Sequence, residues 1–264
     1  MGEVLAHADY RGHFSHGLNR LEMYHNDMKV GVIKSSTGIS PENAATAWVN
    51  GNGVLGTVTA EFSMKLAIKK AKESGIGMVV AKGANHYSIA GHWALMAEQE
   101  GLIGMSFTNT SPKTYPTRGS APSLGTNPIS FFAPAEKGDY FGLDMATTTV
   151  ALGKIEVNQR RGVPIPDGWG TNKVGEVTND AELCMKEGGL LPLGGTEETG
   201  GYKGFGLCMM VEVLCGILGD GKYGSNVRRW GFHGENDEEA NLGQCFMAID
   251  PTPSLPDSKV ECLI

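Results

Sequence analysis

The sequence Gly51-Asn-Gly-Val-Leu-Gly56 matches the G-x-G-x-x-G pattern with which classical Rossmann domains bind dinucleotides. A predicted strand, Ala44–Val49, precedes it, and an amphipathic helix, Ala60–Ser74, follows it. The classical mechanism also requires an acidic residue at the end of the second strand, where it binds the ribose hydroxyl. That strand is predicted at Ile76–Ala81, and Lys82-Gly83 follows it without an acid. We therefore interpret Gly51–Gly56 as a tight structural turn, with a classical Rossmann site as the alternative.

Helices and strands are mixed on both sides of this turn. The opening segment to Met28 is predicted to be helical, and further helices are predicted at Ser88–Gly101, Thr148–Arg161 and Lys203–Leu218. Additional strands are predicted at Leu102–Phe107, Pro128–Phe132 and Tyr140–Asp144. This mixture predicts an α/β protein with a mixed sheet. Polar loops follow several of the strands, and such loops are where α/β sheets carry their sites.

Composition argues against two classes of partner. The 264 residues carry a net charge of −7, and the pI is near 5.5. Basic residues occur in pairs but not in longer runs, so we expect no nucleic-acid partner. No apolar stretch approaches the length of a membrane span, and the polar N-terminus has no signal-peptide pattern. The five cysteines are odd in number and contain no C-x-x-C pair, so we expect reduced thiols in a cytoplasmic protein.

His16, Arg20 and Tyr24 are spaced i, i+4 and i+8, which on a helix places an imidazole, a guanidinium and a phenol on one face. A 2-hydroxy acid dehydrogenase needs such a set, because a guanidinium binds the substrate carboxylate and an imidazole accepts the hydroxyl proton. The alternative is an ordinary solvated helix face. His13 and His16 form a His-x-x-His pair, but no third or fourth ligand is apparent, so we expect no metal.

Three other stretches offer chemistry at the ends of predicted elements. His86, in Asn85-His-Tyr87, ends a strand before a helix, a favoured place for a catalytic side chain; the alternative is that Asn85 or Ser88 caps the following helix and His86 only packs. Asp144-Met145-Ala146 lies before a predicted helix, where free N–H groups favour an anion or a cofactor amide; capping by Thr147 is the alternative. Lys203-Gly204 opens an apolar helix after a glycine-rich stretch, and the lysine is either an anion ligand or an exposed first-turn residue.

Together these stretches resemble the malate/L-lactate dehydrogenase family of NAD(P)-dependent enzymes. The resemblance runs in the family's order from residue 11 to about residue 251. The matching stretches are Arg11-Gly-His-Phe-Ser-His-Gly-Leu-Asn-Arg20, Asn85-His-Tyr-Ser-Ile-Ala-Gly91, Thr108-Asn-Thr-Ser-Pro112, Gly125-Thr-Asn-Pro128, Leu143-Asp-Met-Ala-Thr147, Gly153-Lys-Ile155, Leu191-Pro-Leu-Gly-Gly195 and Tyr202-Lys-Gly-Phe-Gly206.

The resemblance implies a mixed-sheet fold that is not a classical Rossmann fold, a homodimer, NAD or NADP as cofactor, and a small 2-hydroxy acid, malate or L-lactate first, as substrate. It implies that His16 and His86 are the acid/base candidates and that Arg20 and Tyr24 contact substrate. The cofactor contacts that it implies are Thr110, Asp144, Met145, Ala146, Lys203 and Gly204.

The sequence also departs from the family pattern at both ends. Family members normally begin with a further helical segment and continue well beyond the Ile-Asp-Pro motif at 249–251. We therefore predict a remnant of an N-terminal helical region over 1–45, a cofactor- and substrate-binding α/β region over 46–250, and an extended or disordered tail over 251–264. The alternative function is a truncated, catalytically inactive paralogue that acts as a binding or regulatory protein.

Overall fold

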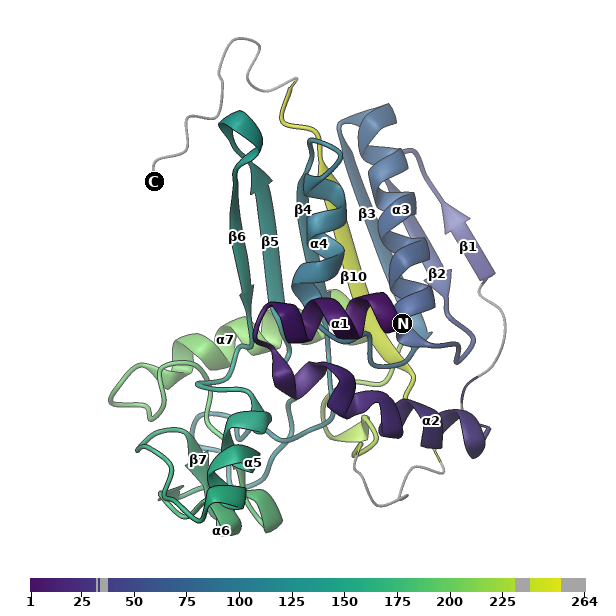
Figure 1. The fold of residues 1–264 in the computed structure, drawn as a ribbon. Coiled ribbons are helices and arrows are strands. Elements are labelled where there is room, and N and C mark those ends of the chain that lie inside the picture. Colours follow the sequence, from purple (N-terminus) through teal and green to yellow (C-terminus); the bar gives the residue numbers. More distant parts are fainter. Residues whose placement is uncertain (32, 34–37, 231–237, 253–264) are drawn as a thin grey trace.

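A seven-stranded mixed sheet forms the centre of the fold in the computed structural model, which describes residues 1–31, 33, 38–230 and 238–252 (Figure 1). Its strands are β1 (Gly38–Glu42), β2 (Thr46–Asn50), β3 (Ile76–Ala84), β10 (Leu242–Ile249), β4 (Ile103–Thr108), β5 (Ile129–Pro134) and β6 (Tyr140–Met145), in this spatial order. Only β2 and β3 run parallel among the pairs within it. The predicted mixed sheet is therefore confirmed.

Helices pack against both faces of this sheet, although part of the second face stays partly exposed. Helices α3 (Gly56–Ser74) and α4 (Ala90–Glu98) pack on one face, where Met64, Trp93 and Phe246 belong to the largest buried apolar cluster (Figure 1). Helix α7 (Gly201–Glu212) and the π-helical turn η4 (Val213–Ile217) pack on the opposite face through a second cluster.

The remaining elements lie outside the large sheet. A small second sheet has the strand order β8-β7-β9, and two short helices pack beside it. The elements are β7 (Gly170–Thr171), β8 (Val177–Thr178), β9 (Gly189–Leu190), α5 (Leu152–Arg161) and α6 (Ala181–Lys186). Two short 3₁₀ turns, η3 (Glu136–Gly138) and η5 (Gly224–Asn226), lie in the connecting loops.

The opening segment is not one helix. It forms α1 (Gly2–Tyr10), the 3₁₀ turns η1 (Phe14–His16) and η2 (Leu18–Arg20), and α2 (Leu21–Lys29). Gly12 has a φ of +79°, which ends α1. At Gly17 a Cβ would meet the Asp9 carboxylate, whose Oδ2 accepts the N–H of Leu18. The prediction of a continuous helix to Met28 was therefore wrong, because glycine and an aspartate hydrogen bond redirect the chain twice.

Two predicted helices begin later than expected, and neither uses the proposed cap. Helix α4 begins at Ala90, and Asn85 donates instead to the carbonyls of Gly53 and Val54. Helix α5 begins at Leu152, and the Thr147 hydroxyl donates to the carbonyls of Thr126 and Asn127. Asn85 and Thr147 therefore stabilise loops and do not cap the N-termini of these helices.

The Gly51–Gly56 turn joins β2 to α3, and β3 follows, so this part of the chain is a βαβ unit. A Cβ at Gly56 would stand 2.0 Å from the Asn85 carbonyl oxygen, so backbone already fills the space at the start of α3. No residue of Gly51–Gly56 lines the large cavity described below. The turn is structural, as predicted, and the start of α3 leaves no room for a pyrophosphate.

Two further expectations bear on the described residues. No described helix is long and apolar enough to cross a membrane. Cys184, Cys208, Cys215 and Cys245 are buried free thiols, whereas Cys262 and most of the predicted tail over 251–264 lie outside the described residues.

Candidate active site

A cavity of about 950 Å³ opens where the 3₁₀ turns, the ends of β4 and β6, and α5 meet. Seven of the ten predicted site residues line it: His16, Arg20, His86, Thr110, Asp144, Met145 and Ala146. Pockets of this size hold ligands of cofactor dimensions. The sequence prediction therefore brought together residues that are up to 130 positions apart.

His16 and His86 lie side by side in this cavity, with ring centroids 5.6 Å apart and stacked planes. Burial, with smaller contributions from the charges of Arg20 and His13, lowers the pKa of His16 to about 4. Burial also lowers the pKa of His86 well below its ordinary value, with His16, Arg20 and Arg228 adding to the shift. Both imidazoles are therefore neutral near pH 7, the state in which a histidine can accept a proton.

The hydrogen bonds of His86 fix its tautomer. Tyr24 is buried, and its Oη lies 2.6 Å from His86 Nδ1. The Ser88 N–H also points at Nδ1, at 3.3 Å, and an N–H can only donate. Nδ1 is therefore the acceptor, and the proton of the neutral ring resides on Nε2. Tyr24 thus touches the site through His86 and does not itself line the cavity.

Arg20 enters the cavity from the end of η2. Its Nε donates to the Ser15 carbonyl at 2.5 Å, and its Nη2 lies 3.4 Å from Glu156 of α5. Both side chains are largely buried, with 11% and 14% of their surface exposed. Ser15 in turn contacts His16, because its Oγ lies 2.8 Å from Nδ1. Arg20 and His16 are therefore held by one short segment, though not on one helix face.

Asp144 is the next-to-last residue of β6 and lies at the cavity wall. Its Oδ2 accepts the N–H of Gly91 at 2.9 Å, so the carboxylate caps the first turn of α4 from a distant strand. Burial raises the pKa of Asp144, and the bond from Gly91 partly offsets this. Met145 and Ala146 continue the wall.

Lys203 and Gly204 lie outside the cavity lining. Lys203 is exposed on the first turn of α7, with its Nζ 6.0 Å from the Tyr202 ring centroid. A Cβ at Gly204 would stand 2.3 Å from the backbone of Leu193, which does line the cavity. Gly204 thus supports a wall residue from behind, and the cofactor contact of this pair remains a prediction.

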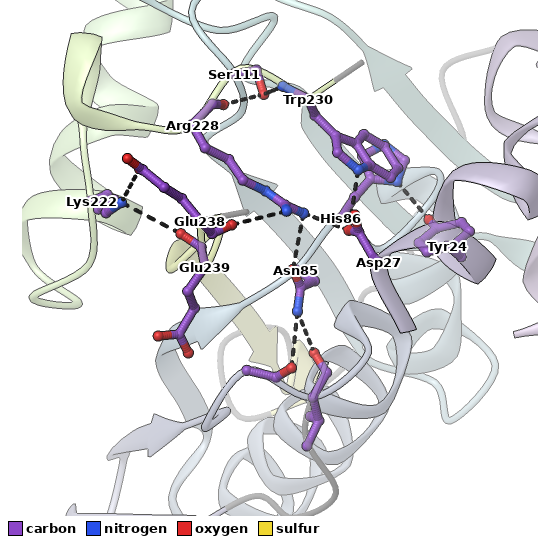
Figure 2. Close-up of polar contacts among 12 residues, drawn as sticks. Tyr24, Asp27, Asn85, His86, Ser111, Lys222, Arg228, Trp230, Glu238 and Glu239 are labelled. Atoms are coloured by element: carbon purple, nitrogen blue, oxygen red, sulfur yellow. Dashed lines mark hydrogen bonds and ion pairs between the residues drawn. The ribbon is translucent and has the colours of Figure 1, made fainter. Parts of the chain in front are cut away.

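Sequence reasoning missed a polar cluster on the far side of His86, shown in Figure 2. Asp27 Oδ2 accepts from Arg228 Nη2 at 2.5 Å and from the Trp230 indole N–H at 3.2 Å. Arg228 and Trp230 both line the cavity. The sequence contained only a basic pair at 228–229 as a signal, because the partners are about 200 positions apart.

The charge of the described lining suits an anionic cofactor and substrate. Six lining side chains are basic, and three are acidic. The basic ones are Arg20, Lys113, Lys154, Arg160, Lys186 and Arg228, and the acidic ones are Asp144, Glu156 and Glu182. Cations of this kind neutralise the pyrophosphate of a dinucleotide and the carboxylate of a hydroxy acid. No described cluster of histidine, cysteine and acidic side chains could hold a metal ion.

Comparison with known proteins agrees with this geometry. A model of the malate/L-lactate dehydrogenase family matches residues 1–261. The malate dehydrogenase of Pyrococcus horikoshii is 44% identical over 263 residues, which are 97% of this chain and 70% of that protein. The solved structure of malate dehydrogenase from P. horikoshii aligns with a TM-score of 0.85 at 41% identity, over 96% of this chain and 69% of that one.

A second solved structure is named for a different substrate. The sulfolactate dehydrogenase of Methanocaldococcus jannaschii aligns with a TM-score of 0.84 at 38% identity, over 95% of this chain and 70% of that one. The fold, the site and these relatives define a hydroxy acid dehydrogenase. The chain belongs to the malate/L-lactate dehydrogenase family, as the sequence motifs predicted.

Proposed function

We propose that the protein transfers a hydride between NAD(P) and a small anionic 2-hydroxy acid, with malate as the first candidate. The observation that carries this proposal is the pair of neutral histidines beside Arg20 in one large cavity. L-Lactate and sulfolactate are the other candidates, because one guanidinium can bind the carboxylate of each.

The two histidines have different roles: His16 accepts the substrate proton, and His86 donates a hydrogen bond. Arg20 binds the substrate carboxylate in competition with Glu156. His86, with its proton on Nε2, donates a hydrogen bond to the substrate oxygen. His16 accepts the hydroxyl proton, with its Nδ1–H directed to Ser15 Oγ. A bound nicotinamide would supply the hydride acceptor for the carbinol C–H, which leaves a 2-oxo acid. Thr110, Asp144, Met145 and Ala146 are the proposed cofactor contacts on the adjoining wall.

Fluorescence titration of the purified chain with NADH and then NADPH tests the cofactor half of this proposal. We expect saturable binding and a clear preference for one of the two. Turnover is then measured with malate, sulfolactate and L-lactate. Absence of binding by a folded sample would overturn the proposal and favour the inactive binding or regulatory protein.

Arg20→Lys tests the substrate half. Lysine keeps the charge but loses the two-pronged geometry, so we expect KM for the hydroxy acid to rise about tenfold or more while cofactor affinity stays unchanged. Arg161→Lys, on the exposed end of α5, is the control. An unchanged KM in Arg20→Lys would remove Arg20 from the substrate site.

We also propose a homodimer in a reducing, cytoplasmic setting. On the sheet face away from α3 and α4, five register partners form one apolar row that stays partly exposed. They are Met78, Met247, Met105, Phe131 and Leu143. An apolar sheet face of this kind is typical of a subunit interface.

Light scattering coupled to gel filtration tests the homodimer. We expect a dimer for the unmodified chain and a monomer for Met105→Glu, at the centre of the row. Val163→Glu, on an exposed loop, should remain dimeric. A monomeric unmodified chain, or a dimeric Met105→Glu, would contradict this interface.

A further inference from the structure

We propose that Trp230, which is held by a hydrogen bond to Asp27, is a positioning residue that keeps the His86 imidazole in its catalytic orientation. The expected effect on turnover rests on the proposed function, whereas the expected effect on the orientation of His86 does not. Neither side chain belongs to a motif from which the sequence predicted the site.

Trp230 is the closest aromatic neighbour of His86. Their ring centroids are 4.6 Å apart, against 5.6 Å for His16 and 5.8 Å for Tyr24. The indole also meets the Tyr24 ring edge-on, at 5.6 Å. Three rings therefore surround His86, and Trp230 restricts the rotation that the hydrogen bond from Tyr24 alone would permit.

The indole is itself fixed at two points. Its Nε1–H donates to Asp27 Oδ2 at 3.2 Å, and its backbone N–H donates to Ser111 Oγ at 3.1 Å. The Ser111 hydroxyl donates onward to the Arg228 carbonyl at 2.7 Å. The segment Arg228–Trp230 is thus bound to the loop after β4 as well as to α2 (Figure 2).

Asp27 connects this segment to the catalytic histidine. It lies three residues after Tyr24 on α2, so one helix carries both the group that donates to His86 and the anchor of the indole. The same carboxylate pairs with Arg228, and the two side chains are only 2% and 6% exposed. Arg228 reaches on to Asn85 Oδ1, at 3.4 Å, in the residue before His86.

A purely structural role does not account for this ion pair. Buried ion pairs add little net stability, because desolvation offsets most of the attraction. Asp27 Oδ1 is buried with no hydrogen-bond partner among the described residues, which is unfavourable in itself. The ion pair instead orients the two side chains, because Arg228 and Trp230 both donate a hydrogen bond to the same oxygen, Asp27 Oδ2.

The test combines one tryptophan variant and one aspartate variant with a matched control. Trp230→Phe keeps an aromatic ring and removes the Nε1–H bond to Asp27. Asp27→Asn keeps an acceptor oxygen and removes the charge. Trp48→Phe is the matched control, because the Trp48 indole also donates one hydrogen bond, to the Gly219 carbonyl, but does not line the cavity.

The first readout is the ¹⁵N NMR spectrum of the imidazole rings, recorded without substrate and assigned with His86→Gln. In the unmodified chain we expect His86 to carry its proton on Nε2 only. In Trp230→Phe and Asp27→Asn we expect the ring to turn away from Tyr24 and the Ser88 N–H, so that its two tautomers average, and in Trp48→Phe we expect no change. An unchanged His86 signal in both Trp230→Phe and Asp27→Asn would overturn the inference.

The second readout is steady-state kinetics. We expect kcat to fall roughly tenfold in Trp230→Phe with KM changed less than about twofold, because misorientation of a catalytic group affects turnover more than binding. A loss confined to KM would also overturn the positioning role. If the unmodified chain oxidises no hydroxy acid, the proposed function fails, and the NMR measurement still decides the role of Trp230.

Discussion

Burial sets the pH range in which His16 can act. A base must be unprotonated, and His16 loses its proton above about pH 4 because burial and Arg20 both disfavour the imidazolium. We expect kcat/KM for hydroxy acid oxidation to stay level down to about pH 5 and to fall near pH 4, rather than near the ordinary histidine value of about 6.5.

The control for this profile is His16→Ala, in which kcat should fall by about 10² or more over the whole range. Circular dichroism at each pH separates loss of activity from loss of fold. A fall in kcat/KM centred near pH 6.5 would contradict a buried neutral base at this position. Near-normal turnover of His16→Ala would transfer the role of base to His86.

Single residues show how far the site could be predicted. His16, Arg20 and His86 were found from their chemistry, and the structure places all three in one cavity. Trp230 was not found, because it meets Asp27 across 203 positions and no local spacing records that contact. Glu156 was missed for the same reason, since its partner Arg20 lies 136 positions away.

At the scale of the elements, the contact between α5 and η1 is predicted to position Ser15 and therefore to affect turnover. A Cβ at Gly153 would stand 2.3 Å from Ser15 Cβ, and Ser15 holds both His16 and Arg20. We expect Gly153→Ala to displace this segment and to lower kcat/KM by about tenfold or more, with a smaller loss of thermal stability.

Gly206→Ala is the matched control, because Gly206 is also helical and a Cβ there meets nothing within 4 Å. It should raise stability by about 0.5–1 kcal/mol and leave the kinetics unchanged. Measured kcat/KM and melting temperatures of the two variants check this contrast. Equal kinetics in both would show that α5 does not position Ser15.

Strand β10 is the central strand that the sequence interpretation lacked. Leu242–Phe246 is buried throughout, so its apolar and small residues do not alternate with polar ones. A strand with neighbours on both edges and cover on both faces shows such a continuous run. By contrast, β2, α3 and β3 were recognised, because an amphipathic helix and a closing glycine mark their boundaries. Gly75, with a φ of +85°, ends α3 where it was predicted to end.

The whole molecule should lose stability as the pH falls below about 6.5. Burial lowers the pKa of His16 and His92 to about 4, and that of His86 well below 6.5. The unfolded chain therefore binds more protons than the folded chain between about pH 6.5 and pH 4, so unfolding is favoured as protons are added. Each histidine contributes a slope of up to about 1.4 kcal/mol per pH unit in that range.

Urea unfolding at intervals of half a pH unit measures this slope. His92→Gln, away from the cavity, should reduce it without altering the kinetics at pH 7, because His92 contacts His7 between α1 and α4. A stability that is constant from about pH 7 to pH 5 would contradict the burial of these rings.

The position of β10 also has a consequence for synthesis on the ribosome. Among the described strands of the sheet, β10 comes last in sequence, yet it lies between β3 and β4 and pairs with both. Until residue 249 has emerged, β1-β2-β3 and β4-β5-β6 are two separate half-sheets, each with an open edge. Open edges of this kind join readily to other chains. The nascent protein therefore remains prone to aggregation until β10 emerges, and protection by a chaperone matters most just before that point.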